Sequence, residues 1–266
     1  MKVIAVNASH RGSRGITALL TERIGRGVQA AGGEYETITL SKLKITRCLA
    51  CSQCQQGGDR FLHCVHEQRD DAVGVFDSIR TSDIVIYATP IYLMTMSSAL
   101  KLLLERMYGT MNCADMQLSN AGLIHHHIDP TLSSKPFVTL VTYANFEDEM
   151  GRSVIEYFRT FARFMNAPQV GVLVRNASPL LESEGTSYHA RIAAVLDAYE
   201  QSGRDLVQHR RIRAVTQRRA NQELIPLPLF RYLRHLKPIK RRILAQTQAF
   251  YAETFSQAES NHSSIK

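Results

Sequence analysis

Five short apolar runs alternate with helix-forming stretches along residues 1–206 of this 266-residue chain. The run at 83–89, DIVIYAT, is almost continuously apolar, which is typical of a strand buried on both faces of a parallel sheet. The predicted strands are residues 2–7, 35–40, 83–89, 137–143 and 169–174, and the predicted helices are residues 16–31, 70–80, 97–108, 149–164 and 188–206. This alternation predicts an α/β fold with a doubly wound, five-stranded parallel sheet.

The loop after the first predicted strand, residues 8–17, carries hydroxyls, a fixed positive charge and glycines directly before a helix. Such a loop lets backbone N–H groups approach an anion at the helix N-terminus, so it is interpreted as a phosphate cradle. Its sequence is neither G-x-G-x-x-G nor a Walker A motif, which disfavours a dinucleotide phosphate or ATP site. An ordinary flexible loop is the alternative. His10 and Arg14 are expected to face solvent.

The loop after the third predicted strand, residues 89–96, is rich in flat or polarisable side chains. A planar heteroaromatic ring packs well against Pro90, Tyr92 and Met94. An apolar loop that packs under a lid has the same pattern. Because ligands of open α/β sheets bind beyond the carboxyl ends of the strands, this loop, the first loop and the loop after the fourth strand are expected to form one site.

Four cysteines, Cys48, Cys51, Cys54 and Cys64, follow the second predicted strand with the spacing C-x2-C-x2-C-x9-C. Thiols at this spacing can converge on one centre as a four-thiolate cage for a [4Fe-4S] cluster or a zinc ion. Buried small side chains or a disulfide pair are the alternative. The fifth cysteine, Cys113, is expected to have no functional role, and the alternative is a reactive thiol near the ligand site.

The motifs V-N-A-S-H-R-G-S-R-G-I-T, C-x2-C-x2-C and A-T-P-I-Y-L-M-T-M-S-S-A-L-K occur in an order that resembles the NADPH-dependent FMN reductase branch of the flavodoxin-like proteins. Within that branch the iron-sulfur flavoproteins are the most similar. The resemblance covers residues 1–174. It implies a flavodoxin-like fold, FMN, a [4Fe-4S] cluster, NAD(P)H as electron donor and a homo-oligomer, either a dimer or a tetramer.

The resemblance also assigns cofactor-binding residues. Those implied for the FMN phosphate are Ser9, Arg11, Ser13, Gly15 and Thr17. Those implied for the isoalloxazine ring are Pro90, Ile91, Tyr92, Leu93, Met94 and Thr95 on one side and Thr142, Tyr143, Ala144 and Asn145 on the other, and the implied cluster ligands are Cys48, Cys51, Cys54 and Cys64. No catalytic side chain is implied, because the chemistry takes place on FMN.

Three departures from the family pattern stand out. Ile16 replaces an Asn that commonly precedes the loop Thr, Ala144 and Asn145 replace glycines, and nine residues separate Cys54 from Cys64, which is longer than the family's usual interval.

The charge of the chain is unevenly distributed. Residues 1–202 hold 19 Lys and Arg against 20 Asp and Glu, whereas residues 203–266 hold 13 against 4. We therefore expect a near-neutral domain over 1–202, with a Cys-rich insertion at 46–70, and a basic helical extension over 203–266. The extension carries a helical apolar face, Leu229, Phe230, Leu233 and Leu236. An arm that packs on the core or on a second subunit is favoured over peripheral contact with an anionic membrane.

Residues 1–15 lack the apolar segment of a signal peptide and no apolar run reaches the ~20 residues of a membrane span, so a cytoplasmic protein is expected. The leading hypothesis is an NAD(P)H-dependent flavin oxidoreductase that passes electrons between FMN and the cluster, with NAD(P)H or a reduced redox protein as its partner. A cluster-free FMN or quinone reductase is the second hypothesis. A four-cysteine zinc module whose basic tail binds nucleic acid is the third hypothesis and ranks lowest. Under the leading hypothesis no nucleic-acid partner is expected.

Three further features are expected to be structural. His125 to His127 are expected to form a solvated polar tract, with a metal or substrate patch that includes Asp129 as the alternative. Asp70 and Asp71 are expected to cap a helix rather than to act as catalytic acids, and Lys101 is expected to pair with Glu105 four residues later.

Overall fold

The computed structural model describes residues 1–56, 61–182 and 189–224, together with 233, 235–246, 248, 249 and 252. The chain divides into two compact units, Met1–Leu224 and Ile225–Lys266. The first unit contains the predicted α/β fold.

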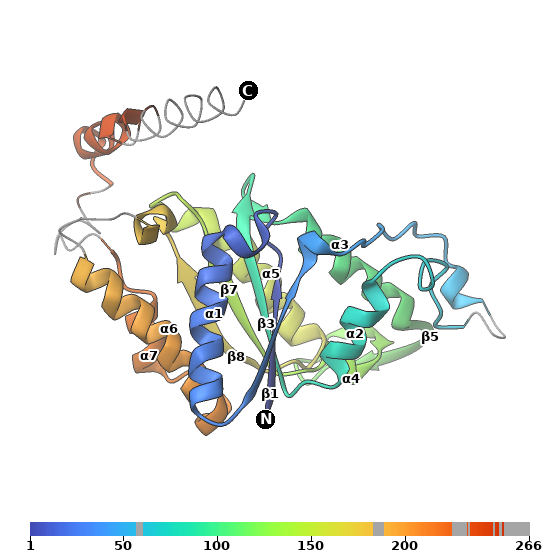
Figure 1. Ribbon diagram of the computed structural model, residues 1–266. Coiled ribbons are helices and arrows are strands. Elements are labelled where there is room, and N and C mark those ends of the chain that lie inside the picture. The colour runs from blue at the N-terminus through green and yellow to red at the C-terminus, as the bar shows by residue number, and fades with distance from the viewer. Residues whose placement is uncertain are drawn as a thin grey trace, which may run out of the picture. The chain divides into compact units, whose positions relative to one another are not determined.

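Five parallel strands form the sheet of the first unit (Figure 1). They are β1 (Lys2–Asn7), β2 (Glu34–Thr39), β3 (Ile84–Tyr92), β7 (Phe137–Thr142) and β8 (Gln169–Arg175), in the order β2-β1-β3-β7-β8. After β1 the chain extends the sheet on one side, and from β3 onward it extends the other side. The switch therefore lies between β1 and β3, which is where sheets of this kind bind ligands. The flavodoxin-like fold expected from the sequence is confirmed.

Helices cover both faces of the sheet (Figure 1). One face packs against α1 (Ile16–Ala30), α6 (His189–His209) and α7 (Ala214–Ala220), and the other against α2 (Ala72–Arg80), α3 (Ser98–Arg106) and α5 (Glu149–Phe164). Alternate residues of β1 enter opposite cores, as the two-residue period of a strand requires: Val3 faces the α1 side and Ile4 faces the α3 side. Each fully buried aliphatic side chain contributes roughly 1.5–3 kcal/mol.

The first compact unit extends to Leu224, and the boundary expected after Ser202 falls within α6. Helix α6 continues through residue 203, and α7 covers the outer edge of β8. Gln217 and Asn221 accept the backbone N–H groups of Val172 and Val174 at 2.7 and 2.8 Å. These amide side chains satisfy a sheet edge that would otherwise be open.

The stretch 109–135, for which no strand or helix was predicted, contains an antiparallel hairpin of β5 (Met111–Leu118) and β6 (Ile124–Ile128) followed by α4 (Pro130–Ser133). A two-residue strand, β4 (Thr95–Met96), folds back on the end of β3. The remaining elements are short 3-10 helices, η1 (Gly12–Arg14), η2 (Leu40–Lys42), η3 (Gln53–Gln55), η5 (Met107–Thr110) and η6 (Ser178–Glu182).

In the second unit, residues 237–246 are helical, and the side chains of Leu236 and Leu244 are exposed. Leu229 and Phe230 of the expected apolar face lie outside the described residues. Among the described helices, none is long and apolar enough to cross a membrane.

Candidate functional site

The loop after β1 is held in shape by the buried carboxamide of Asn7. Its Nδ2 donates to the carbonyl of Gly12 at 3.2 Å, and its Oδ1 accepts the N–H of Ser9 at 3.0 Å. The hydroxyl oxygen of Ser9 accepts the N–H of Arg11 at 3.2 Å, and Gly12 adopts the left-handed conformation, with φ of 59°. The loop is therefore ordered by its own residues, and it leads into α1, whose first N–H groups have no partner within the helix.

The predicted phosphate residues divide into two groups. Arg11 and Ser13 are exposed, whereas Ser9, Gly15 and Thr17 are buried. A Cβ on Gly15 would lie 3.0 Å from the Ser9 hydroxyl, so the backbone passes close to that side chain. The N-terminus of α1, an exposed guanidinium and a serine hydroxyl are a donor set that suits a phosphate dianion.

Ile16, the first departure from the family pattern, packs in the core beneath the loop and is 8 % exposed. The loop thus exchanges a polar side chain at this position for apolar packing under α1.

The second loop is tied to the first through Ser97. Its hydroxyl donates to the carbonyl of Ala8 at 2.6 Å, and its N–H donates to the Thr89 hydroxyl at 2.9 Å. The loop itself is a tight turn between β3 and β4, in which Leu93 and Met94 have φ of 47° and 69°. Bulky residues rarely adopt this left-handed conformation, so the turn is strained, and Leu93 is also 93 % exposed.

The third loop, after β7, joins the first through a hydroxyl pair. The Oγ1 atoms of Thr17 and Thr142 lie 2.9 Å apart, although 125 residues separate them in sequence. The ring of Tyr143 belongs to the core beside Gly151, and the Asn145 carboxamide accepts the N–H of Glu147 at 3.0 Å. The three loops therefore meet at the switch point between β1 and β3.

A cleft of about 630 Å³ lies beside the second loop. The imidazole of His10 stacks on the ring of Tyr92, with centroids 5.2 Å apart, and its Nε2 lies 3.3 Å from the Ser98 hydroxyl. Lys101, which pairs with Glu105 at 2.6 Å as expected, also lines the cleft. The volume falls within the usual range for small-molecule sites. His10 is exposed, as expected from the sequence, but only the fold reveals that its ring stacks on Tyr92.

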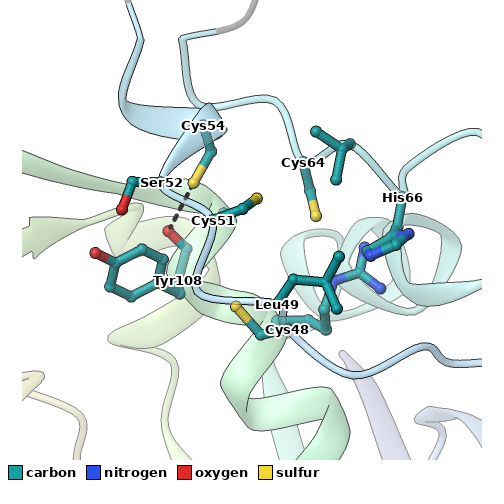
Figure 2. A pocket seen from close by; sticks show the side chains of 11 residues that line it. Cys48, Leu49, Cys51, Ser52, Cys54, Cys64, His66 and Tyr108 are labelled. Atoms are coloured by element: carbon teal, nitrogen blue, oxygen red, sulfur yellow. Dashed lines mark hydrogen bonds between the residues drawn. The ribbon is translucent and has the colours of Figure 1, made fainter.

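Cys48, Cys51, Cys54 and Cys64 all line a second cavity, here called the cysteine cavity (Figure 2). The segment between them turns sharply, with Ala50 and Ser52 in the left-handed region at φ of 50° and 54°. Cys54 is buried and its thiol donates to the carbonyl of Tyr108 at 3.9 Å, whereas Cys51 is exposed. The backbone of Gly109 passes close to Cys64, because a Cβ on Gly109 would lie 3.2 Å from the Cys64 Cβ.

The cysteines are thiols in this structure, since the described residues contain no disulfide. Nor do the described residues contain three or more His, Cys, Asp or Glu side chains already set as ligands around one point. Burial raises the pKa of the Cys54 thiol, an effect opposed by the amide of Gln55 and increased by the nearby sulfurs of Cys64 and Cys48. Burial disfavours the charged thiolate form of Cys54. A metal centre would supply positive charge and favour that form, because coordination stabilises thiolates.

A buried ion pair fixes both ends of the cysteine segment. Asp70 accepts hydrogen bonds from the backbone and hydroxyl of Thr46, from the N–H of Ala72 and from the guanidinium of Arg106. Burial alone would raise the pKa of Asp70, but the hydrogen bonds from Thr46 and Arg106 outweigh it and lower the pKa to about 2. Asp70 thus contacts the first turn of α2 as expected, while the Asp71 carboxylate instead accepts the N–H of Lys44 at 2.7 Å.

The remaining candidates lie outside both sites. Cys113 is on β5, where its sulfur lies 3.5 Å from the Tyr108 hydroxyl and its N–H donates to Gln55, but it does not line the cysteine cavity. His127 lies 3.9 Å from Asp115 and 2.9 Å from the Gln117 amide on the β5–β6 hairpin.

Three comparisons place the chain among known proteins. The family model described as NADPH-dependent FMN reductase matches residues 1–171. An iron-sulfur flavoprotein from Archaeoglobus fulgidus is 30% identical over 106 residues, which are 40% of this chain and 48% of that protein. An iron-sulfur flavoprotein from Methanocaldococcus jannaschii is 28% identical over 106 residues, 40% of this chain and 51% of that protein. The chain spans about half the length of these curated relatives.

Solved structures share the fold. An FMN-dependent NADH-azoreductase from Bacillus anthracis, crystallised with FMN, gives a TM-score of 0.55 at 10% identity and covers 78% of this chain and 99% of its own. An NAD(P)H:quinone oxidoreductase from Methanothermobacter marburgensis gives 0.53 at 16% identity, over 77% and 98%. The family model covers most of the first unit, including the first two loops and the cysteine segment, and on that ground the chain belongs to the NADPH-dependent FMN reductase family.

Proposed function

We propose that this protein is an NAD(P)H-dependent FMN oxidoreductase that passes electrons between FMN and a [4Fe-4S] cluster held by Cys48, Cys51, Cys54 and Cys64. The observation that carries the cluster assignment is that all four thiols of the motif line a single cavity. The family match supports FMN and NAD(P)H, and the names of two distant relatives support the cluster.

In this proposal the first loop binds the FMN phosphate through Arg11, Ser13 and the first N–H groups of α1. The strained turn at Leu93 and Met94 and the loop at Thr142 to Asn145 would hold the flavin ring between them. FMN held there would supply the chemistry that joins a two-electron nicotinamide donor to a one-electron cluster. The side chains of the three loops bind and orient the flavin and take no proton themselves.

Helix α3 provides a direct structural connection between the two sites. Ser97 and Ser98 at its N-terminus contact the first two loops, and Arg106 at its C-terminus lines the cysteine cavity. The helix has nine residues, which corresponds to a length of about 13 Å at 1.5 Å per residue. One helix of a single chain therefore joins residues of both proposed sites.

Anaerobic purification with an absorption spectrum and analysis of flavin, iron and sulfide tests the proposal. We expect flavin bands, a broad reducible absorption around them, and four iron and four sulfide for each cluster. Each of the four Cys→Ser variants should lose iron and sulfide while retaining FMN, and Cys113→Ser should change neither. Full iron content in any one of the four variants would remove that residue from the ligand set.

A cluster-free FMN or quinone reductase is the second candidate. The observation that favours it is that the described cysteines, as they stand, are not arranged as metal ligands. A purified protein that shows flavin bands, contains no iron and oxidises NAD(P)H would establish this candidate. Zinc without flavin would instead support the four-cysteine zinc module.

We also propose that the protein is a homo-oligomer. The β5–β6 hairpin exposes Met116, Leu118 and Ile124 by 54%, 69% and 66%, and Leu118 pairs directly with Ile124 across the two strands. Such a contiguous apolar surface is suited to burial against another subunit. Sedimentation velocity of the intact protein measures the oligomeric state.

A further inference from the structure

Two buried nitrogen atoms without hydrogen-bond partners belong to residues that line the cysteine cavity. Among the described residues, six buried side-chain N or O atoms lack a partner, and two of these are Nε of Arg106 and Nε2 of His66. Both residues line the same cavity as the four thiols. Buried polar groups are almost always hydrogen-bonded, so two such exceptions at one cavity call for an acceptor that binds there.

Arg106 is the better supported of the two candidate hydrogen-bond donors. The residue is 2 % exposed, and its NH1 is already engaged by Asp70 and by the carbonyl of Thr46. That ion pair fixes the guanidinium plane, and Nε–H remains as a donor without an acceptor. The planar guanidinium group suits this position, because an Arg can donate to a carboxylate through one nitrogen while another nitrogen donates to a different acceptor.

His66 completes the pair. It follows Cys64 by two residues, and Figure 2 shows it beside that cysteine at the cavity. In the tautomer with hydrogen on Nε2, its ring supplies a second N–H donor. The nearby His63 differs, because its Nδ1 is bound to Glu67 at 3.0 Å and its side chain is 61% exposed.

We infer that Arg106 and His66 donate N–H···S hydrogen bonds to the sulfur atoms of the cluster and thereby raise its reduction potential. This inference rests on the proposed cluster. A four-thiolate iron-sulfur cluster brings sulfur acceptors to the cavity, and hydrogen bonds to those sulfurs are among the factors that set its potential. Reduction adds one electron and no atom, so the donors stabilise the more negative, reduced state.

An EPR-monitored redox titration of the purified, cluster-loaded protein tests the inference. His66→Phe keeps an aromatic ring but removes the donor, and His63→Phe is the matched control in the same segment. Arg106→Lys keeps a cation beside Asp70 and removes Nε–H. We expect the midpoint potential to fall in His66→Phe and in Arg106→Lys by the equivalent of about a tenfold change in the one-electron equilibrium, which is 59 mV. His63→Phe should match the wild type.

The outcomes separate the two proposals. Absence of iron from the wild-type protein would refute the proposed cluster and with it this inference. A loaded cluster whose potential is the same in His66→Phe, His63→Phe and wild type would refute the role of His66. If Arg106→Lys fails to fold, the His66 comparison still decides whether this cavity donates hydrogen bonds to the cluster.

Discussion

At the scale of single residues, the site depends on contacts between segments far apart in the chain. Asn7 fixes the first loop, and Ser97 joins that loop to the second across 89 residues of sequence. Neither residue was predicted to belong to the site, because a buried polar side chain is recognised by its partners, and the partners are set by the fold. The hydroxyls, glycines and charge of the first loop were recognisable because they are adjacent in sequence.

Arg11 gives the sharpest test of the phosphate assignment. It is exposed, so Arg11→Ala should leave the fold intact while removing a charge-assisted hydrogen bond of about 1.5–3 kcal/mol. We expect FMN to bind about tenfold more weakly or worse, as measured by quenching of flavin fluorescence. Riboflavin, which lacks the phosphate, is the control, and its affinity should be the same for wild type and variant. Equal FMN affinities would show that Arg11 does not contact the phosphate.

Asp70 makes stability depend on pH. Its pKa in the folded protein is about 2, below the ordinary value of 3.8, so its stabilisation is complete above about pH 4 and is lost as the pH falls toward 2. The difference corresponds to about 2 kcal/mol. We expect urea unfolding of the wild type to show this loss, whereas Asp70→Asn should lack it.

At neutral pH the same Asp70→Asn variant should be less stable by about 3–5 kcal/mol, because Arg106 would keep a buried charge without its carboxylate. Asp77→Asn is a suitable control, since the Asp77 carboxylate pairs with Arg80 and is 63% exposed. Comparable losses in the two variants would mean that burial of the Asp70–Arg106 pair has no special importance for stability.

At the scale of elements, hydrophobic periodicity predicted every strand of the parallel sheet and the long helices between them. It failed for the β5–β6 hairpin and for β4. The β4 turn places Leu93 and Met94 in a conformation usually supplied by Gly or Asn, so no turn signal is present. The hairpin contains a register shift between Asn112 and Met116, which interrupts the alternation by which a strand is recognised.

The backbones of α1 and α6 approach each other closely at two glycines. A Cβ on Gly27 would lie 1.8 Å from the carbonyl oxygen of Glu200, and one on Gly203 would lie 2.0 Å from that of Ile24. Both obstacles are backbone atoms, so the helices would have to separate. We expect Gly203→Ala to lower the free energy of unfolding by about 3 kcal/mol, the upper end of the usual cost of overpacking.

Gly74→Ala is the matched control for that helix contact. Gly74 lies within α2, is exposed, and has no atom within 4 Å of a built Cβ. Alanine there should stabilise the protein by roughly 0.5–1 kcal/mol, because glycine is costly in a helix interior. Urea denaturation of both variants provides the comparison. Equal stabilities would contradict the close α1–α6 packing.

At the scale of the whole molecule, charge composition was an incomplete guide to the division of the chain. The sequence changes character near residue 203, but six of the 13 Lys and Arg beyond that point lie at 204–219, within the first unit. They occupy α6, α7 and their junction, whose apolar sides are buried: Leu206 and Ala220 are fully enclosed. A basic surface can therefore cover a well-packed element, and composition alone does not distinguish this from an extension.

Two truncations test where the first unit ends. A protein that stops after Leu224 should keep the melting temperature of α/β unfolding, because every described element of the first unit is retained. One that stops after Ser202 should aggregate or unfold at room temperature. It loses the end of α6, the buried side chains Leu206 and Ile212, and the α7 amides that cover the edge of β8.

Calorimetry and gel filtration in low and high salt measure both truncated proteins. Because loss of apolar burial and of edge-strand hydrogen bonds causes the failure, the deficit of the shorter protein should persist at high salt, where exposed charges are screened. Rescue of that protein by salt would show that charge repulsion, and not missing packing, is the cause. A stable, monodisperse protein ending at Ser202 would return the boundary to the position that the charge pattern suggested.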